Sequence, residues 1–308
     1  MSSITDNTTA LQSLLNIVEQ LSVGSGLSED DMKLIENISS LVTSCVFDYT
    51  PAIATLSPLS NVDYIVGISD LDAQTMHICA EAISNNSEIT NTTTTVYVSN
   101  GEINRKISVG DKITIPLNGK DYSFAIIGFN HDKLTDDELG YGHKTATGLA
   151  GMTLQLCEGF DTKYAIHDTD GAVEWETCMM KKNIMPLMER YMPPEWSFRM
   201  KLVNKLYASA YDITHDTIST SKNNKCFLLA IGEIISPDEI PQYAEAGYVT
   251  QYASYRQSND FLEIRTYWTR SVKSENYFYA VNGSQYSNGI TSQAIITTSN
   301  NIVFAFCI

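Results

Sequence analysis

The spacing of apolar residues separates an N-terminal part with a helical repeat from a longer part with the shorter repeats of strands. In residues 9–23 and 28–45, Leu, Ile and Val recur every three or four positions, which is the period of an amphipathic helix. Gly24 or Gly26 ends the first helix, and Ser28 stands where an N-cap residue begins the second. The pattern predicts a helical hairpin within residues 1–50, with a role in attachment or oligomerisation, or simply in packing on the rest of the chain.

From residue 51 onward, β-branched and aromatic residues alternate with turn residues, which favours strands. We expect residues 51–106 to form a β-rich linker or small domain, and residues 107–308 a mixed α+β domain. Helices are expected in 175–192, in 196–206 and within 237–255. Strands are expected in 62–68, 75–80, 92–98, 107–116, 123–129, 153–157, 226–231, 267–270, 277–281, 294–298 and 302–307. A turn at Asn118-Gly119 is expected to join the strands 107–116 and 123–129.

Composition excludes some partners. The formal net charge is -16 and no cluster of Lys and Arg stands out, so the chain lacks the phosphate contacts of a nucleic-acid-binding protein. No apolar run approaches the ~18 residues that a membrane span needs. The first nine residues also lack the basic and apolar regions of a signal peptide. We therefore expect synthesis in the cytoplasm and no membrane insertion.

Sequence motifs give little support for catalysis or metal binding. The six Cys are widely spaced, and the chain has no CxxC, HExxH, P-loop or GxSxG motif. Asn130-His131-Asp132, followed by the acidic stretch 136–138, could offer oxygen ligands to a cation, but its spacing matches no EF-hand. A loop in which His131 and Asp132 fix backbone groups is the favoured alternative. We expect no enzyme activity, no metal and no cofactor.

The last 33 residues, 276–308, contain no charged side chain and are rich in Tyr, Asn and Ser. This composition is typical of recognition surfaces, although a buried terminal hairpin would also fit it. In an alternating strand, Tyr277 and Tyr279 would point outward while Phe278 points into the core. The expected ligand contacts are Tyr277, Tyr279, Asn282, Gln285, Tyr286 and Asn288.

Three other residues are expected to have structural roles. Trp175 and Trp268 are predicted core anchors. Arg270, two residues after Trp268, would be a buried charge that needs a carboxylate partner.

A further set of short segments follows a recognisable order along residues 107–308: Val109-Gly110-Asp111 with Asn118-Gly119, 124–132, 175–180, 225–234, Glu245-Ala246-Gly247 with Gln251-Tyr252, 267–271 and 304–307. In this order the segments resemble a domain family found in phage and prophage proteins of gut bacteria, whose fold is similar to C-type lectins and to the formylglycine-generating-enzyme group. Met180 and Asn301 depart from the family pattern, which has Arg and Gly there.

The resemblance implies a virion protein with a C-type-lectin-like domain at a tail fibre or tail tip, which adheres to a bacterial surface glycan or protein. Residues 1–50 would then contact other virion proteins, in a homo-oligomer such as a trimer. A capsid decoration, head fibre or baseplate component that contacts only virion proteins is the alternative. A wall hydrolase would need paired carboxylates that we do not find. The cysteine pair of the formylglycine-generating relatives has no counterpart motif around Cys226 and Cys307.

Overall fold

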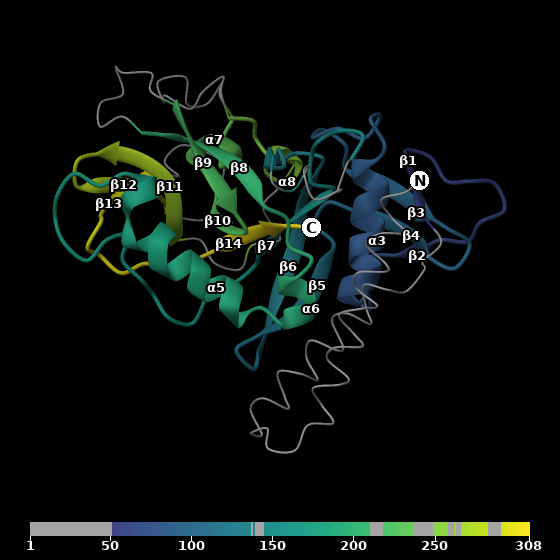
Figure 1. Ribbon diagram of the computed structural model, residues 1–308, viewed down its shortest axis with the longest axis horizontal. Coiled ribbons are helices and arrows are strands. Elements are labelled where there is room, and N and C mark those ends of the chain that lie inside the picture. Colours follow the sequence, from purple (N-terminus) through teal and green to yellow (C-terminus); the bar gives the residue numbers. More distant parts are fainter. Residues whose placement is uncertain are drawn as a thin grey trace, which may run out of the picture.

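The chain forms a strand-rich, mixed α+β structure in the computed structural model (Figure 1). The predicted hairpin of residues 1–50 lies outside the described residues, as do the side chains of residues 257, 282 and 291–294. Among the described residues, no helix is long and apolar enough to cross a membrane. The described residues are 51–136, 138, 145–209, 218–236, 249–257, 262, 266–282 and 291–308.

A small four-stranded sheet opens the described chain, with the strand order β1-β3-β4-β2. The pair β2–β4 is parallel, and the other neighbours are antiparallel. Its strands are β1 (Ile53–Thr55), β2 (Ile65–Val66), β3 (Thr95–Ser99) and β4 (Asn104–Ser108).

Helix α3 (Ala73–Ser84) packs between this small sheet and the rest of the protein (Figure 1). The strand predicted for 75–80 is therefore wrong. The Asp72 side chain accepts a hydrogen bond of 2.7 Å from the backbone N–H of Thr75 and begins the helix as its N-cap. Because α3 is covered on two sides, its apolar residues are not confined to one stripe, and the helical period is obscured.

A five-stranded antiparallel sheet forms the centre of the fold, in the order β10-β14-β7-β6-β5. The turn predicted at Asn118-Gly119 is confirmed, since both residues have the positive φ that tight hairpins need. The strand predicted for 107–116 is divided, because Gly110 turns the chain with a φ of 93°. The strands are β5 (Lys112–Leu117), β6 (Lys120–Phe129), β7 (Met152–Leu156), β10 (Cys226–Leu228) and β14 (Phe304–Cys307).

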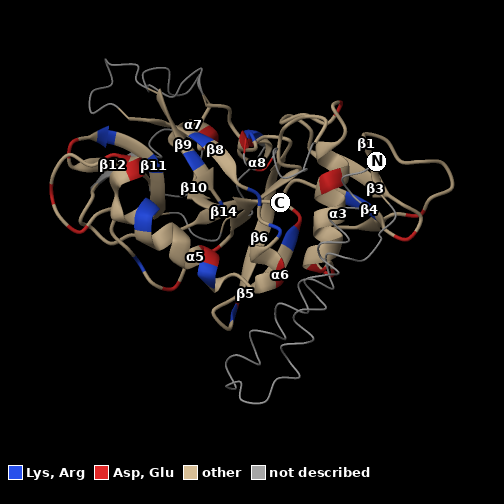
Figure 2. Cartoon of the chain, viewed as in Figure 1, with Lys and Arg blue, Asp and Glu red and all other residues tan. Residues whose placement is uncertain are grey.

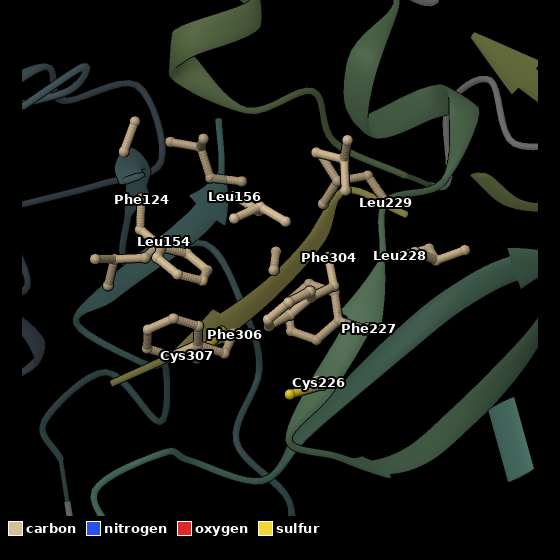
Figure 3. Close-up of a cluster of buried hydrophobic side chains, with 14 of the residues drawn as sticks. Phe124, Leu154, Leu156, Cys226, Phe227, Leu228, Leu229, Phe304, Phe306 and Cys307 are labelled. Carbon is tan, nitrogen blue, oxygen red and sulfur yellow. The ribbon is translucent and has the colours of Figure 1, made fainter. Parts of the chain in front are cut away.

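The central core is aromatic on one face of this sheet (Figure 3). The ring of Phe124 meets the rings of Phe304 and Phe306 edge-to-face at centroid distances of 5.6 and 5.4 Å. Cys226 is paired with Phe306 in register, so Cys226 and Cys307 point to opposite faces of the sheet. The two cysteines are in separate strands, as predicted, and both are buried.

The remaining strands form two further sheets, β8-β9 and β11-β12-β13. Residues 203–206 were predicted to end a helix but lie in a strand, because the helix α6 is a single turn that ends at Ser197. The helix predicted for 175–192 begins with a 3-10 turn and a π-helix. The strands are β8 (Val203–Ala208), β9 (Ile218–Asn224), β11 (Thr266–Ser274), β12 (Tyr277–Asn282) and β13 (Thr291–Ile295). The helices are η1 (Trp175–Thr177), η2 (Met180–Ile184), α5 (Met185–Tyr191), α6 (Pro194–Ser197), α7 (Ile231–Ile234) and α8 (Ala253–Gln257).

Close contacts join the small sheet and α3 to the central sheet. The Asn130 amide donates to the carbonyls of Ile83 and Ile89 at 3.0 and 2.9 Å, so it satisfies carbonyl groups at and beyond the end of α3. Gly151 lies directly against the backbone of Ala80. One continuous hydrophobic core runs through both parts, and a domain boundary at residue 106 stays a prediction.

We expect Gly151→Ala to destabilise the protein strongly, since the added Cβ would lie 1.9 Å from the Ala80 carbonyl oxygen. Overpacking of this kind costs about 1–3 kcal/mol, and more where backbone must move. Urea unfolding followed by circular dichroism measures the loss. Gly159→Ala is the matched control, because Gly159 also lacks a left-handed φ and its new Cβ would meet only the Asn301 side chain, at 3.0 Å. A smaller loss for Gly151→Ala than for the control would contradict the expected packing.

Candidate functional site

Four buried charged residues from four separate segments meet beside the central sheet. Asp132 follows β6, Lys205 lies in β8, Glu233 in α7 and Arg270 in β11, and each is 3% exposed or less. The Lys205 ammonium forms ion pairs with both carboxylates and lies 2.7 Å from Glu233. Arg270 lies 2.7 Å from the other oxygen of Glu233. Segments of opposite charge meet near α7 and β8 in Figure 2. We call these four residues the charge cluster.

Local backbone geometry brings Asp132 into the cluster. Asn130 has a φ of 41°, which turns the chain at the end of β6. Gly128 lacks a side chain where the ring of Tyr252 lies against β6. The Tyr252 hydroxyl can therefore reach the Asp132 carboxylate, to which it donates a hydrogen bond of 2.7 Å.

The N–H groups of the two cations, Lys205 and Arg270, donate hydrogen bonds to groups inside the protein. Lys205 has three ammonium protons, and its three partners are Asp132, Glu233 and the Tyr252 hydroxyl. Arg270 donates from Nε and Nη2 to the Leu206 carbonyl and from Nη1 to the Leu228 carbonyl, at 2.6–3.0 Å. The carboxylate that Arg270 was predicted to need is Glu233.

The two carboxylates are equally well satisfied. Asp132 also accepts from the Thr153 hydroxyl at 2.6 Å and from the Cys307 thiol at 3.2 Å. Glu233 accepts a bond of 2.9 Å from the backbone N–H of Ala230. Because each buried charge has an opposite charge and further hydrogen bonds, the cost of removing it from water is offset.

The electrostatics of the charge cluster favour the ionised carboxylates. Burial alone would raise the pKa of Glu233, but the charges of Arg270 and Lys205 outweigh it and lower this pKa to about 2. Burial opposes ionisation of Asp132 too, and Lys205 and His131 hold its pKa well below the usual range. Burial raises the pKa of the Tyr252 hydroxyl and the Cys307 thiol well above their usual values. The tyrosine and the cysteine are therefore neutral hydrogen-bond donors at physiological pH.

A cavity of about 310 Å³ lies next to the charge cluster. In its wall, the Asn204 side-chain oxygen has no hydrogen-bond partner among the described residues. The cavity is therefore able to hold water or a small polar molecule. Its lining residues are His131, Asp132, Lys133, Asn204, Lys205, Leu206, Thr220, Glu233, Val249 and Thr250.

His131, Asp132 and Glu233 place possible metal-ligating atoms within 4.8 Å of one another. The Lys205 ammonium already contacts both carboxylates, so the chain supplies its own cation at this point. His131 also stacks on the Tyr252 ring at a centroid distance of 3.7 Å and bonds to the Thr250 carbonyl. The prediction that Asp132 fixes backbone groups is wrong, because its partners are side chains, whereas His131 does contact a backbone carbonyl.

The predicted ligand contacts differ in whether the structure describes them and in how exposed they are. Tyr277 is half-buried in β12, and Phe278 is buried as expected. The prediction that Tyr279 points outward is wrong, since its side chain is 5% exposed. Strand β12 lies between β11 and β13, and the Lys273 ammonium lies 5.6 Å from the centre of the Tyr279 ring. Gln285, Tyr286, Asn288 and the side chain of Asn282 lie outside the described residues.

The predicted structural residues are all buried. Trp175, Trp268 and Arg270 are each 0% exposed, and the Trp268 ring N–H donates to the Tyr164 carbonyl at 2.9 Å. Sequence reasoning missed Lys205, because it placed this residue in a helix, and it gave no role to Glu233 or Tyr252. Glu233 comes just after the apolar run 226–231, and this position could have indicated a buried, paired carboxylate.

Comparisons with known proteins give no relative: no family model, no curated protein and no solved structure matches this chain.

We expect Glu233→Gln to lower the free energy of unfolding by about 3–5 kcal/mol, because it leaves two buried cations with one carboxylate. Urea denaturation at neutral pH measures this. Asp161→Asn is the matched control, because it removes the same charge from an exposed pair with Lys120 and should change stability little. Equal losses in the two variants would contradict the role given to the charge cluster.

Acid should unfold the protein through the same carboxylates. Their pKa values are lower in the folded than in the unfolded chain, so their stabilisation is complete above about pH 4.5. It is lost as the pH falls toward the folded-state pKa of Glu233 at about 2. Unfolding midpoints measured between these limits should fall with pH, and fall less steeply in Glu233→Gln. A slope unchanged by the substitution would count against ionised Glu233.

Proposed function

We propose that this chain is a non-catalytic virion protein whose C-terminal domain is C-type-lectin-like and adheres to a glycan or protein on a bacterial host surface. The resemblance of residues 107–308 to phage and prophage domains motivates the assignment. The observation that best supports it is the pairing of β12 with β13, because these strands flank the uncharged segment 283–290.

The strands on either side of this segment are fixed by strand pairing and by the charge cluster. Val281 of β12 is paired with Thr291 of β13, so residues 283–290 connect two neighbouring strands of one sheet. The neighbouring strand β11 carries Trp268 and Arg270, both fully buried and hydrogen-bonded. Binding residues on loops work best when a rigid scaffold positions them.

The chemistry of the loop suits a polar ligand. Residues 282–290 have the sequence NGSQYSNGI, which contains amides, hydroxyls and one aromatic ring but no charge. Tyr277 begins β12 at the other end of the strand, where it is paired with Ile295, so the proposed surface would have to run along the length of β12 to include this half-buried aromatic side chain. Aromatic rings give contact area at low entropic cost, and amides and hydroxyls supply adaptable hydrogen bonds. Tyr279 is no longer part of the proposed surface, because it is buried.

The saturated charge cluster supports a role without catalysis. A general base or nucleophile must be able to reach a substrate, whereas the protons of Lys205 and the oxygens of Glu233 are taken up by internal partners. The cluster therefore acts in this proposal as the frame of the binding domain.

The test is binding of the labelled full-length chain to a panel of gut bacterial strains. We expect strain-selective binding that Tyr277→Ala/Tyr286→Ala weakens roughly tenfold or more, as the loss of aromatic contact residues does at interfaces. Phe198→Ala is the matched control, because it removes an exposed aromatic ring, 57% exposed, outside this sheet.

Unfolding midpoints of the variants show whether each is folded. A folded double variant that binds as well as the unaltered chain would contradict the proposed surface. Absence of binding to every strain would favour a capsid decoration, head fibre or baseplate component that contacts only virion proteins. Labelled-antibody microscopy of particles would then locate the protein.

A further inference from the structure

Exposed apolar side chains gather on the small N-terminal sheet and the loop that follows β1. Among the described residues, eight large apolar side chains are exposed, and five of them lie between residues 53 and 66. Ile53 lies in β1 and Ile65–Val66 in β2, the two edge strands of the sheet, so a contact surface that includes them must span β3 and β4. The five are Ile53, Leu56, Leu59, Ile65 and Val66.

The strand register shows which face of the sheet is open. In one row across the four strands, Thr55 is paired with Tyr97, Tyr97 with Lys106, and Lys106 with Val66. Paired residues share a face, so Val66 and Tyr97 point the same way. The ring of Tyr64 packs edge-to-face on Tyr97 at 5.2 Å and extends this surface.

The opposite face of the same sheet is filled over β1, β3 and β4, whereas Ile65 at its β2 edge is exposed. Ala54, Val96, Val98 and Ile107 alternate with the residues of the open face and are 5% exposed or less. They pack toward α3, which lies between the small sheet and the central sheet (Figure 1). The open face, which we define by Ile53, Tyr64, Val66 and Tyr97, is therefore the side on which a partner can add.

We propose that residues 28–45 of the same chain cover the open face as an amphipathic helix. The sequence of this segment places Leu34, Ile35, Ile38, Leu41 and Val42 at helical spacing, which makes one apolar stripe. An isolated helix of this length is marginal in water and gains its stability by burying such a stripe. The open face offers Ile53, Val66 and two tyrosine rings for that purpose, and Thr55 and Lys106 lie in the same row as Val66 and Tyr97.

The chain connection allows this docking and favours it over a second copy. Ten residues separate Val42 from Ile53, and they span up to about 33 Å when extended. Four strands are only about 14 Å wide from first to last, so the helix can reach any part of the open face. A short connection also gives an effective concentration in the millimolar range, which a second copy does not have at ordinary protein concentrations. The inference does not depend on the proposed adhesion.

Hydrogen exchange of the full chain, read by mass spectrometry, tests this. Backbone amides in residues 28–45 should exchange at least ~10-fold more slowly than unstructured chain. Ile53→Lys/Val66→Lys should remove that protection, since it places two charges on the open face. Leu206→Lys/Ile295→Lys is the matched control, because it makes the same changes at exposed apolar positions in β8 and β13.

Peptides from β6 and β7 report whether each variant keeps its core, and Ile53→Ser/Val66→Thr replaces the lysine variant if it does not. Protection that is lost only in the open-face variant, and that is independent of protein concentration, supports the proposal. Three results would overturn it: no protection of residues 28–45 in the unaltered chain, protection that survives the open-face substitutions, or protection that rises with protein concentration. The last result would assign the open face to a second copy.

Discussion

The ion pairs of Glu233 with Lys205 and Arg270 are the constraint on which the arrangement of the C-terminal part depends. They join α7, β8 and β11, and Lys205 extends the connection to Asp132 after β6. None of these segments is next to another in the sequence, so the charge cluster fixes contacts that chain connectivity alone leaves free. Buried charges tolerate few alternative arrangements, because an unpaired charge in the interior costs several kcal/mol.

The charge cluster and the aromatic core together make up the interior of the C-terminal part. The interior is held by saturated polar groups and by the aromatic core around Phe124, Phe304 and Phe306. The contacts proposed above lie outside this interior, on the uncharged segment that follows β12 and on the open face of the small sheet. In the proposed adhesion, the buried interior would position the binding residues and take no part in binding itself.

Sequence patterns predicted the parts of the fold where local rules dominate. The Asn118-Gly119 hairpin, the buried Phe278 and the need of Arg270 for a carboxylate all follow from short-range geometry or from the cost of a buried charge. The failures occur where tertiary packing overrides local pattern. Helix α3 is covered on two sides and loses its amphipathic stripe, and β8 carries a buried lysine that reads as a surface position. Tyr279 is buried because β12 is a central strand, and strand order is not visible in one sequence.

The most direct test of the charge cluster is a double-mutant cycle on Lys205→Met and Glu233→Gln, with the free energy of unfolding measured by urea denaturation of the full chain. Methionine keeps an unbranched side chain of similar length against the Phe227 ring, over which the Lys205 ammonium lies at 4.2 Å. We predict that the double variant loses less unfolding free energy than the two single variants lose together. The difference, which is the coupling between the two residues, should be about 1–3 kcal/mol. Losses that add to within about 0.5 kcal/mol would show that the two residues act independently, and would contradict the account.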